Sequence, residues 1–512
     1  MRIRRFPTAG SACVVAAALV LAGCAGAGGG TAGQSDPTLD IATMTFPQSL
    51  DPVTAVGGAL PFFQATYDTL LKREPDGAYR PMLATEWTWD AGRTNLSLTL
   101  RGDVRFDDGT PFDGTAVKAN LERFKASSGA NAKWLSGLEQ VEVVDATHVV
   151  LHLDAPDPAY LHYLSDAAGL IANPAAFADA EKLKTTPDGT GPYELDASQT
   201  TVGTKWVYRR AEGYWGERLP FDGVTMTVFD NETAIVNGLK TGQIDTAVVQ
   251  DANQQAALEG ATGLTTTPIN FDYQGILLFD RAGVVTPELA DVKVRQALNH
   301  AIDRKTMLEQ IRRGKGVVTS QIFGTNSLGY DEALDSHYAH DPEKAKRLLA
   351  EAGHADGFEL KMPRMTSIVT EAIASSLKSD LADVGITLTW VDVDQGDALR
   401  RVFQNREFSG FVMNLGQQAS DWLVIKDLVL PGTFNLFGYT DETVRALVPE
   451  IQTSSTEDAR DDLRALNRNL VENAWFVPFY RMTYALVTDS GVTATPQSGM
   501  AVPSLYNYRP AA

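Results

Sequence analysis

The chain has 512 residues, of which 44% are hydrophobic and 21% charged, proportions that are typical of a globular protein and exclude wholesale disorder, collagen and a coiled coil. The length predicts roughly three structural units or two large lobes. The formal net charge of -20, from 44 basic and 64 acidic side chains, argues against nucleic acid as a partner, because a nucleic-acid-binding surface must be basic. The acidic excess is typical of a soluble surface, and attraction of cationic ligands is the alternative.

The N-terminus has the pattern of an export signal. Three arginines within the first five residues precede a short apolar stretch at 14–21, and small residues then lead to Cys24. The stretch is too short to span a bilayer as a helix. The pattern resembles the bacterial lipoprotein signal, which implies that residues 1–23 are a signal peptide and that Cys24 carries the lipid. We therefore expect an extracytoplasmic protein that is anchored to the cell membrane, with a plain secretory signal as the alternative.

Residues 24–36 are expected to form a flexible tether, because the tract 25–34 is uncharged and rich in Gly and Ala. Three of its glycines have the spacing G-x-G-x-x-G of a dinucleotide-binding loop. No strand precedes them and no helix follows, so the linker interpretation is preferred. Cys13 and Cys24 are the only cysteines, and the chain beyond them therefore has no disulfide and no cysteine-based zinc site.

From residue 37 onward, the hydrophobic pattern alternates between strands and helices. Strands are predicted at 39–45, 96–100, 141–153, 224–229, 244–249, 273–279, 386–391 and 411–415. Helices are predicted at 291–312, 341–353 and 456–473, the second with Asp341 as N-cap and proline at its first position. This mixture predicts α/β lobes. The clearest boundary is the Thr-rich stretch near 262–275, which divides the body into two halves.

Five motifs follow one another in the body of the chain. They are DGAYRPMLATEW (76–87), LTLRGDVRFDDGTPF (98–112), TGPY (190–193), DVKVRQALNHAIDR (291–304) and DPEKAKRLLAEAG (341–353). In this order they resemble the family 5 extracellular solute-binding proteins of ABC transporters, the dipeptide, oligopeptide and nickel group. The resemblance covers about residues 37–510.

The resemblance implies an α/β periplasmic-binding-protein-like fold with two lobes, a hinge of crossing strands and a ligand cleft between the lobes. Lobe I would comprise residues 37–272 with an extra subdomain at about 75–187, and lobe II residues 273–486, while residues 487–512 would return to lobe I. A ligand favours the closed state only by binding both lobes at once. The implied function is that of a monomeric substrate-binding lipoprotein of an ABC importer, which captures short peptides for a membrane permease without catalysis or cofactor.

A short peptide brings a positive and a negative end into the cleft, and each charge is costly to desolvate unless it is paired. Arg suits the peptide carboxylate through its bidentate fork. Arg364 follows the predicted strand 358–362 and stands 21 residues before Gly385. It resembles, in loop and spacing, the carboxylate-binding Arg of dipeptide-binding members. A solvated loop arginine is the alternative.

Asp421 lies in the loop GQQASDW (416–422) and resembles the amine-binding Asp of the family, although this loop departs from the family form by a few residues. An ordinary helix N-cap is the alternative for Asp421. Trp422 is expected either to line the cleft or to pack in the core. Tyr273, near the predicted crossing strand, and Phe46, just past the first strand, are weaker candidates for the cleft.

Other ligands stay open, namely an oligosaccharide, an opine, a nickel or other metal chelate, and haem. A directly bound metal fits poorly, because His148 and His152 are separated by about 13 Å along a strand and no third ligand is evident. A sugar site would need stacked aromatic side chains. A secreted hydrolase has the least support, since the chain contains no G-x-S-x-G, H-E-x-x-H or P-loop motif.

Overall fold

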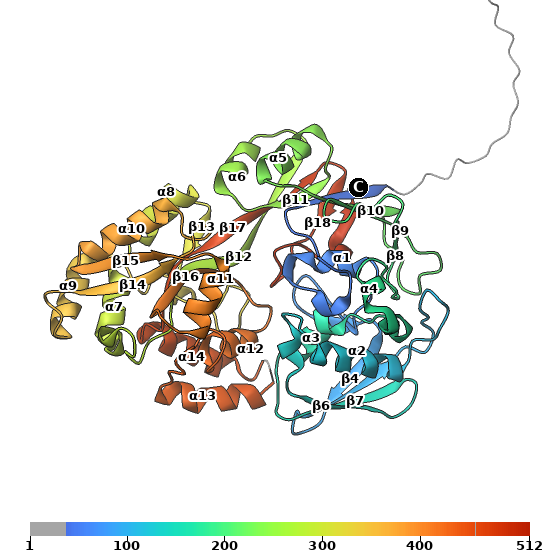
Figure 1. Ribbon diagram of the computed structural model, residues 1–512, viewed down its shortest axis with the longest axis horizontal. Helices are drawn as coiled ribbons and strands as arrows, with labels where there is room; N and C mark the ends of the chain where they lie inside the picture. Colours follow the sequence, from blue (N-terminus) through green and yellow to red (C-terminus); the bar gives the residue numbers. More distant parts are fainter. Residues whose placement is uncertain (1–36, 456, 512) are drawn as a thin grey trace, which may run out of the picture. The chain divides into compact units, whose positions relative to one another are not determined.

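The computed structural model describes residues 37–455 and 457–511, so the predicted signal peptide, the tether and Cys24 lie outside the described residues. A nine-stranded mixed sheet runs through the body in the order β16-β12-β17-β11-β1-β10-β9-β8, with β13 beside β17 (Figure 1). Its strands are β1 (Thr38–Thr43), β8 (Tyr193–Leu195), β9 (Lys205–Arg210), β10 (Gly223–Val228), β11 (Thr246–Val249), β12 (Leu264–Leu278), β13 (Gly316–Val318), β16 (Gly410–Gly416) and β17 (Phe476–Asp489). Its two parallel pairings among the described residues are those of β1 with β10 and with β11.

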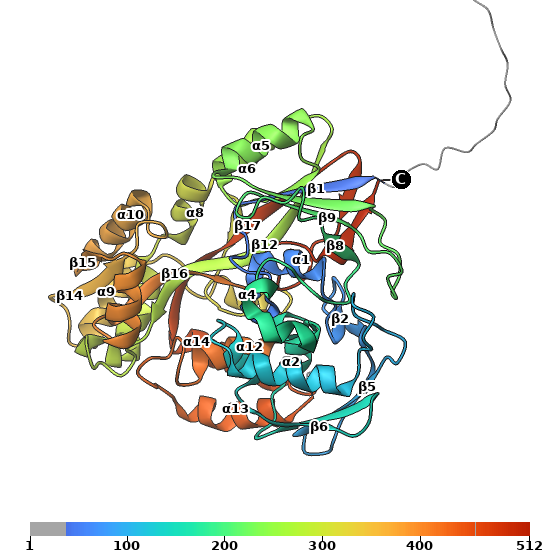
Figure 2. The same cartoon turned by 45° about the vertical axis from the view of Figure 1, so that its right-hand side comes forward.

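Two long antiparallel strands of this sheet, β12 and β17, pass between the lobes (Figures 1 and 2). They have 15 and 14 residues. Val487 of β17 pairs with Thr266 of β12 and with Ala247 of β11, in lobe I. The other end of β12 pairs with β16 of lobe II. The register shifts between Asn270 and Asp272, so a bulge interrupts the ladder midway. The predicted strand 273–279 is the second half of this crossing strand.

Lobe I also contains a four-stranded antiparallel sheet in the order β4-β5-β7-β6. Its strands are β4 (Ala84–Trp89), β5 (Asn95–Leu100), β6 (Leu138–Val143) and β7 (His148–Leu153), and helix α2 (Gly114–Ala126) packs against β6. The prediction of one strand over 141–153 is wrong, because the chain turns back at Asp145. Its carboxylate accepts a hydrogen bond from the Thr147 N–H at 2.8 Å, and this turn overrides the continuous apolar pattern.

The remaining elements of lobe I are short. They are α1 (Leu60–Gln64), β2 (Leu71–Arg73), β3 (Tyr79–Pro81), α3 (Tyr160–Leu164), α4 (Ala180–Leu183), α5 (Glu232–Thr241), α6 (Ala252–Leu258), β18 (Val492–Ala494) and β19 (Tyr508–Pro510). The C-terminal segment contacts lobe I, because the Tyr506 hydroxyl donates to the buried Asp68 at 3.1 Å. We propose that the lobes divide between residues 272 and 273 and again between residues 486 and 487.

Lobe II carries the parallel pair β14 (Phe358–Arg364) and β15 (Ile386–Asp392). Its helices are α7 (Val292–Ala301), α8 (Arg304–Arg312), α9 (Pro342–Glu351), α10 (Glu371–Ala382), α11 (Gln395–Asp397), α12 (Asp421–Val424), α13 (Glu442–Thr453) and α14 (Arg460–Glu472). Helix α9 confirms the predicted cap, since Asp341 accepts from the Lys344 N–H. The single helix predicted over 291–312 is wrong: Asp303 caps a new helix, α8, and the backbone at Ile302 is extended.

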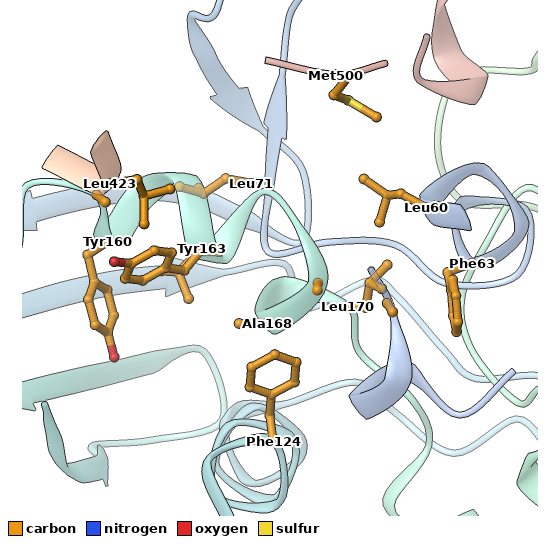
Figure 3. Close-up of a cluster of buried hydrophobic side chains, with 14 of the residues drawn as sticks. Leu60, Phe63, Leu71, Phe124, Tyr160, Tyr163, Ala168, Leu170, Leu423 and Met500 are labelled. Atoms are coloured by element: carbon orange, nitrogen blue, oxygen red, sulfur yellow. The ribbon is translucent and has the colours of Figure 1, made fainter. Parts of the chain in front are cut away.

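The largest buried apolar cluster contains side chains from both lobes. Leu60, Phe63 and Leu71 of lobe I belong to it together with Leu423 of lobe II (Figure 3). The two lobes therefore share part of their apolar core in this structure. Burial of apolar surface of this kind stabilises the fold by about 25 cal/mol per Å². None of the helices in the described residues is long and apolar enough to cross a membrane.

Gly191 of the TGPY motif is expected to tolerate no side chain. A Cβ atom there would lie 2.3 Å from the Thr66 carbonyl carbon and 2.6 Å from the Tyr67 nitrogen, and both are backbone atoms that cannot rotate away. Gly191→Ala should therefore lower the free energy of unfolding by about 2–3 kcal/mol, as overpacking does, in urea denaturation. Gly102→Ala is the control, with Thr147 Cγ2 at 3.4 Å. Equal urea midpoints for the two variants would contradict this expectation.

Candidate ligand-binding cleft

A cavity of about 300 Å³ lies between the four-stranded subdomain of lobe I and helices of lobe II. Its walls include Trp134, Asp157 and Tyr160 from lobe I and Trp422, Lys426 and Gln452 from lobe II. We call it the aromatic cavity. Small-molecule sites typically start at about this volume and combine apolar walls with a few polar groups, so the cavity has the size and composition of a ligand site.

Aromatic contacts position the lobe I wall of the aromatic cavity. Trp134 stacks on Tyr163 with ring centroids 5.2 Å apart and an interplanar angle of 14°. Tyr160 packs edge-on against Trp89, and Figure 3 shows Tyr160 and Tyr163 side by side on α3. The Tyr160 hydroxyl is buried and has no hydrogen-bond partner among the described residues. Because buried polar groups nearly always find a partner, this hydroxyl is available to a bound polar group.

Two reciprocal ion pairs join the lobes, one in the wall of the aromatic cavity and one outside its lining. Lys426 Nζ of lobe II lies 3.0 Å from Asp157 Oδ2 of lobe I. Lys133 Nζ of lobe I lies 3.0 Å from Asp427 Oδ1 of lobe II. Gln452 adds a hydrogen bond of 2.8 Å to a backbone carbonyl of lobe I. Each lobe supplies one cation and one anion, and the cleft is therefore closed at this edge.

Two further cavities lie near the crossing strands. The larger, of about 350 Å³, is lined by residues 268–271 of β12, by residues 496–500, by Pro75 and Asp76 of lobe I, and by Thr325 and Asn326 of lobe II. The smaller, of about 40 Å³, is lined by Tyr273 and Gln417 among others. The Tyr273 hydroxyl and Gln417 Oε1 are buried without a partner among the described residues, so this small cavity also offers polar atoms.

The structure distributes the five predicted site residues over several places. Trp422 lines the aromatic cavity and Tyr273 the small cavity. Phe46 packs against Trp206, with ring centroids 5.5 Å apart, and lines none of the cavities described here. The prediction that these residues contact a ligand stays a prediction for each of them.

Asp421 and Arg364 each have a partner within lobe II. Asp421 Oδ2 accepts a hydrogen bond from the Leu328 N–H at 3.0 Å, and burial raises the pKa of Asp421 although this hydrogen bond opposes the shift. The Arg364 guanidinium donates to Glu371 Oε2 at 2.7 Å and to the Val369 carbonyl at 3.2 Å. Neither residue lines the three cavities above, and their predicted roles as charge partners of a peptide stay predictions.

No three His, Cys, Asp or Glu side chains come together as a metal site within residues 37–455 and 457–511. His148 contacts Asp145 at 2.9 Å, while His152 contacts Glu142 at 2.9 Å and Asn95 at 2.6 Å. These histidines are engaged in local polar contacts on the four-stranded sheet.

Sequence reasoning missed most of the aromatic cavity. Lys426 stands four residues after Trp422, and helical side chains at that spacing share a face, so this was the one available signal. Nothing in the local sequence marks Trp134, Asp157 or Tyr160, because they reach the cavity only through contacts with lobe II, across hundreds of residues.

Comparison with known proteins identifies the family of the chain. The model of the family described as bacterial extracellular solute-binding proteins, family 5 Middle, matches residues 78–422. The chain belongs to this family. The glutathione-binding protein GsiB of Salmonella paratyphi A is 28% identical over 342 residues, which are 66% of this chain and 65% of the relative. The chain thus matches slightly less than two thirds of the length of this relative.

Solved structures of low sequence identity share the fold. The protein AgaA of A. tumefaciens R10, in complex with agropinic acid, is 24% identical with a TM-score of 0.75 over 93% of this chain and 99% of its own. DppA of Helicobacter pylori, in complex with the peptide STSA, is 20% identical with a TM-score of 0.76 over 93% of this chain and 98% of its own. The predicted two-lobe α/β fold class of the family is confirmed.

Proposed function

We propose that the chain is the substrate-binding lipoprotein of an ABC importer, which captures short peptides between its lobes and delivers them to a membrane permease. Membership of the extracellular solute-binding family supports capture of a solute. The relative GsiB is named for binding glutathione, itself a short peptide, and DppA was solved with a peptide. The protein acts as a monomer and makes no bond in its ligand.

One observation carries this proposal: both lobes line a single cavity, to which lobe I brings the anions Asp154 and Asp157 and lobe II the cation Lys426. A ligand that fills the cavity contacts both lobes at once and therefore favours the closed state. Peptides carry an ammonium and a carboxylate group, whose desolvation such a site can compensate. The closed, loaded form then differs in shape from the empty form, and the permease can distinguish the two.

The test is to identify the small molecule that copurifies with the untagged mature protein, by mass spectrometry after denaturation. A peptide at near-stoichiometric amount is expected. A thermal-shift screen of peptides, sugars and metal chelates should agree, because a ligand that binds only the folded state raises its melting temperature. Retention of agropinic acid, an oligosaccharide, a chelate or haem instead would replace the proposed substrate, and multiple turnover of a peptide would make the protein a hydrolase.

The lipid anchor at Cys24 has its own test. Cys24→Ser removes the sulfur that would carry the lipid, and a single acyl group already shifts a protein towards the membrane. Expressed in a bacterial host, the wild type should fractionate with membranes and incorporate a labelled fatty acid, whereas the variant should incorporate none. Equal labelling of both would contradict lipidation at Cys24. Release of the wild type into the soluble fraction would favour the plain secretory signal.

A further inference from the structure

The aromatic cavity contains unsatisfied groups that match the two ends of a peptide. We propose that Lys426 binds the ligand carboxylate and that Asp154 binds the ligand ammonium group, so that this cavity anchors the charged ends of a short peptide. The inference rests on the proposed function and assigns these two roles to residues other than Arg364 and Asp421.

Lys426 has one hydrogen-bond donor to spare. Its Nζ contacts Asp157 Oδ2 at 3.0 Å and the Tyr163 hydroxyl at 3.4 Å, while an ammonium group has three N–H donors. The side chain is 31% exposed and lines the cavity. A ligand carboxylate can therefore take the third donor without breaking the ion pair between the lobes.

Asp154 supplies the opposite charge. It is exposed at the rim of the cavity, and its carboxylate has no hydrogen bond or ion pair within the part of the chain that the structure describes. Its backbone N–H is held by the Gly137 carbonyl at 2.9 Å, which fixes the position of the residue. A ligand ammonium group can therefore pair with this carboxylate without displacing a side chain of the described residues.

The wall between these charges suits a peptide backbone and an apolar side chain. Trp134 and Trp422 offer aromatic surface from the two lobes, which binds apolar side chains well. Tyr160 is 1% exposed, and its hydroxyl, which has no partner among residues 37–455 and 457–511, can hydrogen-bond a peptide carbonyl or N–H. The class of ligand is therefore a zwitterionic short peptide rather than a neutral sugar or a peptide with blocked ends.

The test uses the mature chain and a pool of dipeptides and tripeptides, screened by native mass spectrometry. The best-retained peptide is then titrated by calorimetry in three forms: free, N-acetylated and C-amidated. In the wild type, each block should weaken binding at least tenfold, because it removes one charge-assisted hydrogen bond. Asp154→Asn should no longer discriminate against the acetylated form, and Lys426→Met should no longer discriminate against the amide.

Glu139→Gln is the matched control, because Glu139 is an exposed acid on strand β6 of the same subdomain and lines none of the cavities described above. This variant should still discriminate against both the acetylated and the amidated peptide.

If Asp154→Asn and Lys426→Met also keep this discrimination, while Arg364→Ala and Asp421→Ala abolish it, the inference is overturned and the proposed function stands. Equal weakening of all three peptide forms by Lys426→Met would assign Lys426 to closure alone. Retention of no peptide from the pool would overturn the proposed function as well.

Discussion

Replacing Arg481 by alanine is expected to lower the free energy of unfolding by about 3–5 kcal/mol, because it breaks a buried ion pair. The Arg481 side chain is 2% exposed, and its Nη1 lies 2.8 Å from Asp335 Oδ1. Its Nη2 donates to the Phe323 carbonyl at 2.8 Å. The substitution leaves both acceptors without this cation. Urea denaturation, followed by tryptophan fluorescence, measures the loss.

The position of the pair explains why the effect should be global. Arg481 lies in β17 opposite Tyr273 of β12, where the two crossing strands run between the lobes, and Asp335 belongs to a loop of lobe II. Arg460→Ala is the control: Arg460 forms an exposed pair with Glu457 at 2.7 Å, and such pairs contribute up to about 1 kcal/mol. A loss in Arg481→Ala no larger than in this control would refute the expectation.

The Arg481–Asp335 ion pair makes the free energy of unfolding depend on pH. Burial raises the pKa of Asp335, but the Arg481 guanidinium and the hydrogen bond from the Tyr330 hydroxyl outweigh it, so the pKa lies below its ordinary value. A depressed folded-state pKa stabilises the fold above the unfolded pKa of about 3.9, and this stabilisation is lost as the pH falls through the folded value. In Arg481→Ala the folded-state pKa of Asp335 should rise towards its unfolded value, so the difference in the free energy of unfolding between wild type and variant should narrow as the pH falls through this range.

Reversing the charge of two lysines is expected to open the cleft. Lys133→Glu combined with Lys426→Glu would place glutamates against Asp427 and Asp157, and like charges facing each other across an interface cost several kcal/mol. The closed population should fall, so the radius of gyration measured by small-angle X-ray scattering should increase without ligand. Peptide affinity should drop by about 100-fold or more, because only the closed fraction binds fully.

A charge-swap rescue separates closure from general damage. Adding Asp157→Lys and Asp427→Lys restores both ion pairs with inverted polarity, and the radius of gyration should return to the wild-type value. Lys118→Glu with Lys346→Glu changes the net charge equally within exposed helical pairs and should leave the scattering curve unchanged. An unchanged curve in the first double variant would show that these pairs do not hold the lobes together.

Strands and helix caps could be predicted from the sequence where residues a few positions apart determine them. The strands at 39–45, 96–100, 224–229, 244–249, 386–391 and 411–415 appear as β1, β5, β10, β11, β15 and β16. The Asp341 cap and the helix it starts were also correct. The two errors, at 141–153 and 291–312, share a cause. In each segment the apolar pattern continues past an aspartate, Asp145 or Asp303, whose side chain forms a turn or a helix cap and so divides the segment into two elements.

The sequence alone determined the α/β class, the family through five ordered motifs, and the caps and turns, since these depend on residues a few positions apart. Tertiary structure decided which charges meet across the cleft: Asp157 and Lys426 are 269 positions apart, and Lys133 and Asp427 are 294 apart. The tertiary structure also pairs Asp421 with the backbone of Leu328 inside lobe II, whereas the partner of Arg364, Glu371, lies only seven residues away. Long-range pairing follows from how whole lobes pack, and no local pattern of residues encodes it.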